Sequence, residues 1–315
     1  MLGFIVRRLG QAVAVVLLVT LIVFILLKVL PGGTARALLG PRASPLAIKT
    51  FDHANGFDKP LIIQYLNWIW RILHGNLGYS FRYNLPVSTL LRAVLPKSLL
   101  LVGVATFLAI VIAVPVGMLQ AIRHNRLIDH IFSGLELVFY SMPVFFLGIM
   151  LIMYLAVNHH VFPSEAPQGA TVAQVIQDPR GLVLPILTLM LITVALFARY
   201  MRSSALDALV QDYVRTARAK GNGRIGVLRR HVFRNALLPV VTLIGLSFPT
   251  LVSGAIVTES IFNYPGMGLT FWTAAQNRDY AVLLGFTLVT GIATVSGSLV
   301  ADIACAALDP RVRVH

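Results

Sequence analysis

Few side chains of this sequence could carry out covalent chemistry. Ser203 and Ser204 are adjacent hydroxyls, but no His and Asp accompany them in an arrangement that would activate a nucleophile. His159 and His160 form an isolated pair, which is only a weak metal signal, and Cys305 is the single cysteine. No Gly-x-x-x-x-Gly-Lys-Ser/Thr loop is present to hold nucleotide phosphates. We therefore predict no catalytic residue, no metal site and no cofactor bound by this chain.

Three acidic residues, Glu136, Glu259 and Asp302, lie in or beside long apolar runs. Charge is costly in such runs and is often functional. For Glu136 we favour a bond to a backbone amide or to a loop arginine over contact with a substrate. For Asp302 we likewise favour pairing, with Arg311 or Arg313. Glu259, at the outer end of its run, fits a structural and a transport role equally well.

The composition of the chain places these residues in a membrane protein. Of the 315 residues, 57% are hydrophobic and only 12% are charged, whereas soluble proteins carry about 25% charged residues. The net charge of +14 could suggest nucleic acid. The basic residues fall between apolar runs, however, and not on one soluble face, so we predict lipid and not nucleic acid as the surroundings.

Six apolar runs are long enough to cross a bilayer, which takes about 20 residues per helix. They cover residues 9–30, 98–122, 131–157, 182–200, 236–258 and 281–305. The predicted fold is an all-α integral membrane protein with six spans. We divide it into 1–30 (the N-terminus and first span), an external segment 31–97, and a five-helix core 98–315 that contains a cytoplasmic loop 201–236.

Basic residues indicate the orientation of these spans. The N-terminus, the second and fourth connections and the tail are rich in arginine, and the third and fifth connections each carry one. Both termini are therefore predicted to be cytoplasmic. Segment 31–97 carries eight Lys or Arg but is long enough to cross regardless of charge. Its aromatic residues fit either the membrane interface or a small external subdomain.

The loop before the fifth span has the most informative pattern. Apolar residues recur at helical spacing from Leu206 to Ala217, and Gly221-Asn222-Gly223 is a typical helix stop. A second, basic helix follows, with Ile225, Leu228 and Val232 on one side. The pattern is compatible with an amphipathic hairpin on lipid headgroups and equally with a lever that fits a soluble protein.

The residues of this loop resemble those of ABC importer permeases, and in particular the dipeptide, oligopeptide and nickel branch. The resemblance is carried by 213–221, His231 and 234–239, in which the Leu-Pro pair comes late, at Leu238-Pro239, as it does in that branch. It extends to most of the chain through 4–9, 77–80, Pro86-Val87, 141–145, 259–268, Asp302 and 308–311. Within the branch, the chain is most similar to the first, B-type, dipeptide permease.

The resemblance implies a permease of the bacterial inner membrane, not an enzyme. Its implied partners are a second homologous permease, two cytoplasmic ATPases that hold ATP and magnesium, and an external substrate-binding protein. The ATPase contact would fall on Asp212, Tyr213, Arg215, Thr216, Ala217 and Gly221. Glu259, Ser141 and Pro143 are our candidates for residues that line the translocation path.

The resemblance further implies ATP-driven import of di- or oligopeptides by alternating access. Nickel chelates and haem are alternative substrates, since their importers share this permease pattern. A secondary transporter is the alternative mechanism, although the internal repeats expected of one are not evident. A membrane-embedded enzyme would need a polar or metal-ligand constellation within the spans, and the sequence lacks one.

Overall fold

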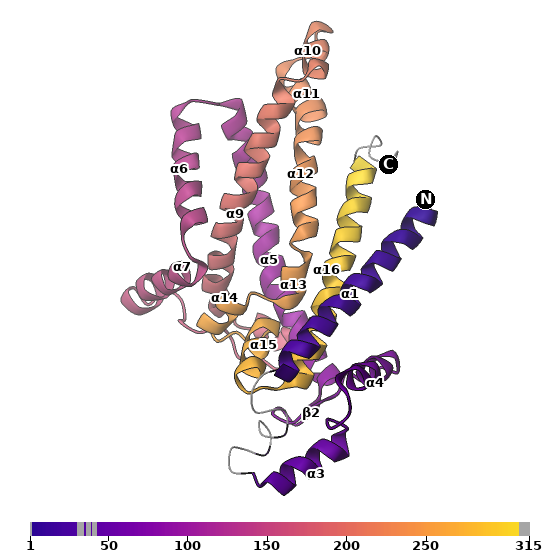
Figure 1. Ribbon diagram of the computed structural model, residues 1–315. Coiled ribbons are helices and arrows are strands. Elements are labelled where there is room, and N and C mark those ends of the chain that lie inside the picture. The colour runs from indigo at the N-terminus through magenta and orange to yellow at the C-terminus, as the bar shows by residue number, and fades with distance from the viewer. Residues whose placement is uncertain (1, 30–34, 36–38, 40–42, 309–315) are drawn as a thin grey trace.

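The computed structural model describes residues 2–29, 35, 39 and 43–308, and in this part the chain is almost entirely helical (Figure 1). The helices that run along the molecule are α1 (Leu2–Val29), α5 (Val87–Ile122), α6 (Leu127–Ser141), α9 (Pro179–Leu209), α12 (Phe233–Leu246) and α16 (Tyr280–Leu308). The start of α1 and the end of α16 point toward the same end of the molecule (Figure 1).

Shorter elements gather at the two ends. At the end toward which the start of α1 and the end of α16 point lie α10 (Asp212–Ala219), α11 (Arg224–Val227) and the π-helical turn η2 (Leu228–Val232). The remaining elements are α3 (Pro45–Asn55), α4 (Leu61–Leu73), β1 (Tyr79–Ser80), β2 (Leu85–Pro86), α7 (Val144–Leu151), η1 (Ile152–Asn158), α8 (Val172–Ile176), α13 (Phe248–Ser253), α14 (Ile256–Ile261) and α15 (Met267–Gln276). The two strands pair antiparallel, with Tyr79 opposite Pro86.

The predicted all-α membrane fold is confirmed. Within the described residues, five helical stretches are long and apolar enough to span a membrane, and a bent helix pair provides a sixth. The five are Gly10–Val29, Val87–Ile122, Pro179–Leu209, Arg224–Ile261 and Tyr280–Val300. The count of six therefore holds when Leu127–Ser141 and Val144–Asn158 are taken together as one span.

That third span is not the continuous helix predicted over 131–157. It turns by 102° between Ser141 and Val144. Met142 has extended backbone angles, φ −79° and ψ 127°. Proline disfavours the helical conformation in the residue before it and has no N–H to bond to the preceding turn. The sequence Met142-Pro143 therefore ends one helix and starts another in a new direction.

The second span begins earlier than predicted, so the boundary drawn between residues 97 and 98 falls inside α5. The helix starts at Val87, directly after the strand residue Pro86. Lys97, the last residue of the predicted external segment, is only 4% exposed, and its Nζ donates to the carbonyl of Gly169 at 3.1 Å. Because its charge has a partner inside the protein, Lys97 does not interrupt the helix.

Helices α5 and α9 pack closely against each other and form the centre of the bundle. Gly117 lies where they cross, and a Cβ on it would come 2.5 Å from the Ala198 carbonyl oxygen and 2.8 Å from the Met201 Cβ. Ala113 and Ala198, both fully buried, extend the same contact. Small residues here let the two backbones approach each other.

Replacing Gly117 with valine should therefore weaken the bundle. The added side chain forces α5 and α9 apart, and overpacking of this kind costs about 1–3 kcal/mol. Gly134→Val is the matched control, because Gly134 also lies inside a helix but an added Cβ there would meet no atom within 4 Å. The midpoint of thermal unfolding of the purified complex should fall for Gly117→Val only. Equal midpoints for the two variants would contradict this account of the crossing.

The external segment packs onto the ends of α1, α5 and α16. The hydroxyl of Tyr65 in α4 donates to the Leu17 carbonyl at 2.9 Å and lies 3.0 Å from the Thr20 hydroxyl, which ties α4 to α1. Ser80 Oγ in β1 donates to Asp279 at 2.5 Å, next to the start of α16. Tyr65 and Trp68 pack with the buried core, whereas Trp70 is 64% exposed. Tyr65 and Trp68 thus anchor the segment on the spans.

Candidate functional site

The loop between the fourth and fifth spans forms a compact helical hairpin, here called the α10–α11 hairpin (residues 210–232). Gly221 makes the turn with φ +81°, a left-handed angle that glycine adopts without strain. The Gly221 N–H donates to the Arg218 carbonyl at 2.9 Å, and the Asn222 N–H donates to the Ala217 carbonyl at 3.3 Å. Gly223 then begins α11. The predicted helix, glycine stop and second helix are all present.

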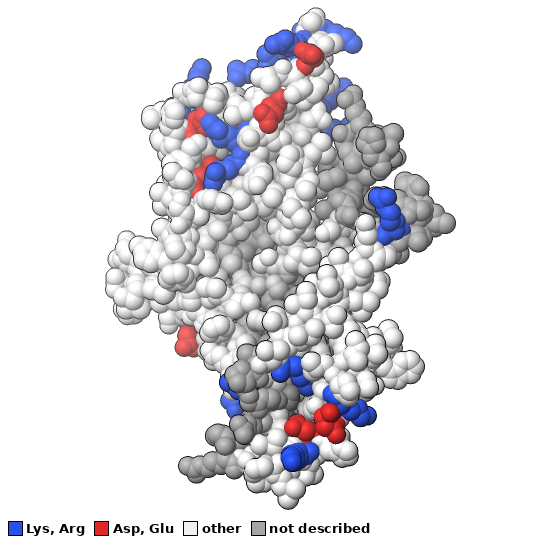
Figure 2. Space-filling view, viewed as in Figure 1, with Lys and Arg blue, Asp and Glu red and all other residues white. Residues whose placement is uncertain are grey.

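The two faces of this hairpin differ sharply. Its inner face is formed by Val214, Ala217, Val227 and Val232, which pack with Ala208 of α9, each at most 5% exposed. The outer face is basic and open, as the blue tip in Figure 2 shows. Its exposed cations are Arg215, Arg218, Lys220, Arg224, Arg229 and Arg230. The hairpin therefore keeps its own shape and presents a charged surface.

Of the residues predicted to contact an ATPase, most lie on this outer face. The side chains of Asp212 and Arg215 are 97% and 78% exposed, and they face each other at 3.8 Å. Tyr213, Thr216 and Gly221 are exposed as well. Ala217 differs, because its side chain packs inside the apolar cluster. Ala217 therefore supports the hairpin from inside and does not lie on the outer face. Its position in the helical repeat turns its side chain inward.

Ile225 was predicted on the apolar side of the second helix, and this was wrong. Its side chain is 81% exposed, whereas Val232 is fully buried. Val210, at the other end of the hairpin, is 68% exposed. Both side chains are large, apolar and open to solvent. One feature of the sequence could have indicated that Ile225 is exposed. It comes directly after the glycine turn, at the start of the second helix.

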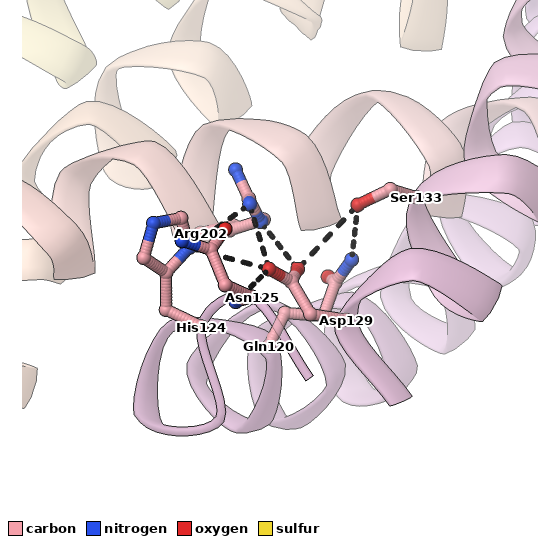
Figure 3. Close-up of polar contacts among 6 residues, drawn as sticks. All are labelled: Gln120, His124, Asn125, Asp129, Ser133 and Arg202. Carbon is pink, nitrogen blue, oxygen red and sulfur yellow. Dashed lines mark hydrogen bonds and ion pairs between the residues drawn. The ribbon is translucent and has the colours of Figure 1, made fainter. Parts of the chain in front are cut away.

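An ion pair fixes the base of the hairpin to the rest of the bundle (Figure 3). The carboxylate of Asp129, 1% exposed, accepts from Arg202 Nε at 2.7 Å and from Arg202 Nη2 at 2.8 Å. It also accepts from the Asn125 N–H at 3.0 Å, and His124 Nδ1 lies 3.2 Å away. These contacts join the turn between α5 and α6 to α9, the helix that leads into α10.

The sequence analysis did not predict this pair. It favoured a bond from Glu136 to a backbone amide or a loop arginine, but within the described residues neither Glu136 oxygen has a hydrogen-bond partner, and Arg202 binds Asp129. The signal was present, since Asp129 is an acidic residue in the first turn of a helix on the arginine-rich side. The side chains of Asp302, Arg311 and Arg313 lie outside the described residues.

Glu259 is enclosed by the chain itself. It is fully buried, and its Oε1 accepts from Ser98 Oγ at 2.7 Å and from the Ala255 N–H at 3.2 Å. Its Oε2 accepts from the Leu269 N–H at 3.1 Å. A Cβ on Gly254, Gly266 or Gly268 would collide with these groups. In this structure no part of the Glu259 carboxylate is open to a substrate, and it joins α5, α14 and α15.

Burial of this region also affects its neighbour Tyr264. The phenol is fully buried, and its hydroxyl donates to the Lys97 carbonyl at 2.7 Å. Removal from water, together with the nearby Glu259, raises the pKa of Tyr264 above its ordinary value. The hydroxyl therefore stays protonated and serves as a donor at physiological pH.

Replacing Glu259 with glutamine should destabilise the protein. The amide nitrogen would have to face one of the three donors that the carboxylate now accepts from, and such a mismatch costs about 1–3 kcal/mol. Glu165→Gln is the matched control, because Glu165 is exposed. The thermal midpoint of the purified complex should fall for Glu259→Gln alone. Wild-type stability with lost transport would instead favour Glu259 as a path residue.

Ser141 and Pro143 lie at the break of the third span, and both are exposed. The structure does not connect them to Glu259, whose bonds are to Ser98, Ala255 and Leu269. Beside the break, between α6 and α9, is a cavity of 560 Å³ lined by Tyr140 but not by Ser141 or Pro143. Figure 2 shows acidic and basic side chains close together over these two helices.

Comparison with known proteins extends the similarity to the whole chain. The family described as the binding-protein-dependent transport system inner membrane component matches residues 113–314, and the N-terminal region of such membrane components matches residues 1–102. The oligopeptide transport system permease protein AppB of Bacillus subtilis is 38% identical over 314 residues, which cover 99% of each chain.

Two further relatives have similar names. A putative peptide permease protein of Brucella suis is 40% identical over 318 residues, covering 100% of each chain. The dipeptide transport system permease protein DppB of Escherichia coli strain K12 is 36% identical over 336 residues, covering 99% of each chain.

Proposed function

The chain belongs to the family of inner membrane components of binding-protein-dependent transport systems, and we propose that it imports di- or oligopeptides as the permease subunit of an ATP-driven importer. The observation that carries the peptide assignment is similarity along the full chain to relatives named as peptide permeases, at 36–40% identity. The chain is a multi-pass protein of the inner membrane and is not itself an ATPase.

The α10–α11 hairpin supports a role in coupling to ATPases. It lies between α9 and α12 at one end of the bundle, packs on a small apolar cluster that it shares with Ala208 of α9, and exposes cations together with Val210 and Ile225. Exposed apolar side chains within a polar surface are typical of protein contact sites. We assign Asp212, Tyr213, Arg215, Thr216 and Gly221 to the ATPase contact. Ala217 supports them from the inside of the hairpin.

The partners follow from this role. A second, homologous permease completes the translocation path, and two ATPases hold ATP and magnesium. An external substrate-binding protein delivers the peptide. The hairpin end of the molecule, toward which both chain termini point, faces the cytoplasm because its arginines are retained there. ATP-driven closure of the ATPases moves the hairpin and, with it, the spans.

Reconstitution tests this function. The tagged chain is co-expressed with the other permease and the ATPases of its system, purified, and inserted into liposomes with the binding protein outside and ATP inside. We expect co-purification of the ATPases and uptake of a labelled dipeptide that requires both ATP and the binding protein. Uptake that follows an ion gradient and ignores ATP would contradict the proposal and favour a secondary transporter.

A further inference from the structure

The cavity between α6 and α9 contains charged groups within a mostly apolar region of the molecule. It is lined by Ser133, Glu136, Leu137, Tyr140, Leu196, Arg199, Tyr200, Arg202 and Ser203. The four residues from α6 recur at helical spacing, so that one stripe of this helix faces the cavity. Its volume of 560 Å³ is within the range of small-molecule sites, about 300–1,000 Å³.

Glu136 is the unusual member of this set. The residue is 5% exposed, and neither carboxylate oxygen has a hydrogen-bond partner within the described structure. Nearly all buried polar groups in proteins are hydrogen-bonded, and an unpaired buried carboxylate is especially costly. The other two buried acids of the spans, Asp129 and Glu259, have several partners each. Glu136 can therefore still accept a hydrogen bond or a cation directly, although Gln120, Arg202 and Arg199 lie near enough to act on its charge.

The cavity also contains a guanidinium without a carboxylate. Arg199 is exposed and lies over the ring of Tyr140, 4.6 Å from its centroid, and it takes part in no ion pair within the described residues. Arg202 differs, because its charge is already neutralised by Asp129. Glu136, which makes no direct hydrogen bond, and Arg199, which makes no ion pair among the described residues, thus line the same cavity together with Ser133, Tyr200 and Ser203.

We propose that this cavity binds the charged ends of a zwitterionic peptide during its passage, with Glu136 receiving the ammonium and Arg199 the carboxylate. This inference rests on the proposed function and names the site within this chain that holds the substrate. A free peptide supplies both missing charges at once. The Tyr140 ring lies under the Arg199 guanidinium and holds it at the edge of the cavity by a cation–π contact.

The position of the cavity links it to the moving parts. Arg202 lines the cavity and also binds Asp129, and Ser133 lines it and accepts from Gln120 Nε2 at 3.3 Å. Seven residues beyond Arg202, α9 ends and the hairpin follows. A peptide held between α6 and α9 is therefore in contact with the two helices whose relative position the hairpin controls.

The experiment compares alanyl-alanine with its N-acetylated and its C-amidated forms in the reconstituted importer. The same binding protein is used throughout, so its own preference cancels when a variant is compared with wild type. Glu136→Gln removes the carboxylate at constant shape, and Arg199→Gln removes the guanidinium. Leu135→Ala, on the same helix but outside the cavity lining, is the control.

We expect Glu136→Gln to reduce the preference for the free over the acetylated peptide by at least about tenfold, because a charge-assisted hydrogen bond is lost. Arg199→Gln should reduce the preference for the free carboxylate over the amide, and Leu135→Ala should change neither. Unchanged preferences in both charge variants would overturn the proposal.

Assembly separates the remaining outcomes. If Glu136→Gln no longer co-purifies with the second permease, its carboxylate pairs with that subunit and the proposal is wrong for Glu136. Arg199 is exposed, so Arg199→Gln should still assemble. If this variant keeps the wild-type preference for the free carboxylate over the amide, the assignment of Arg199 to the peptide carboxylate is wrong. If wild type itself imports no peptide, the proposed function fails. If wild type imports peptide and the variants keep its preferences, only the cavity assignment fails.

Discussion

Replacing Gly221 with valine is expected to uncouple ATP hydrolysis from peptide uptake. Gly221 has φ +81°, an angle that a β-branched residue adopts only with a strain of about 1–3 kcal/mol. A shift of that size reduces the population of the native turn, and with it productive ATPase contact, by about 5- to 150-fold. Uptake by the reconstituted complex and peptide-stimulated ATP hydrolysis are the measurements.

Gly223→Val is the control for this prediction. Gly223 lies in the same turn and is equally exposed, but its φ is −60°, and neither glycine has any atom within 4 Å of an added Cβ. Uptake should therefore stay near wild type. Gly221→Asn should fall between the two, because asparagine tolerates the left-handed angle better than other residues with a side chain. If Gly221→Val transports like Gly223→Val, the shape of this turn does not matter for coupling.

Replacing Asp129 with asparagine is expected to be the most destabilising single change among the charged residues. The carboxylate is buried and binds Arg202 through two nitrogens, so its removal leaves a guanidinium that is only 27% exposed without its partner. Breaking a buried pair in this way costs about 3 kcal/mol or more. The thermal midpoint of the complex should fall, and uptake should fall with it because α9 leads directly into the hairpin.

The exposed pair Asp212–Arg215 provides the comparison. Its atoms are 3.8 Å apart and both side chains are open to solvent, so Asp212→Asn should leave the thermal midpoint unchanged. Only stability is compared for Asp212→Asn, since Asp212 belongs to the proposed ATPase contact and its loss can also alter transport. An Asp129→Asn protein as stable as wild type would show that the buried pair does not hold α6 and α9 together.

The helices that the sequence predicted well are those whose pattern is local. Six apolar runs mark the spans because only a helix satisfies its own backbone in lipid. The glycine turn was predicted because Gly221 is followed closely by Gly223 within a polar loop. The break at Met142-Pro143 is also local, and the effect of a proline on the residue before it would have predicted it.

The errors concern contacts between helices. The predicted external segment ended at Lys97, but Lys97 lies inside α5, where the carbonyl of Gly169, more than seventy residues away, accepts from it. Ala217 looked suited to a close contact with a partner and instead packs on α11 and η2. In each case the residue type was compatible with an exposed and with a buried position, and contact with another part of the chain decided between them.

The sequence alone was sufficient for the membrane class, the spans, the basic end and the family resemblance, because each depends on composition or on spacing along one helix. Which acid meets which base was decided only by tertiary structure. Glu136, Glu259 and Asp129 are all carboxylates in or beside spans. In the part of the chain that the structure describes, the first accepts no hydrogen bond, the second is held by Ser98 and backbone amides, and the third binds an arginine 73 residues away. Burial and electrostatic pairing depend on how the helices cross, and no single helix contains that information.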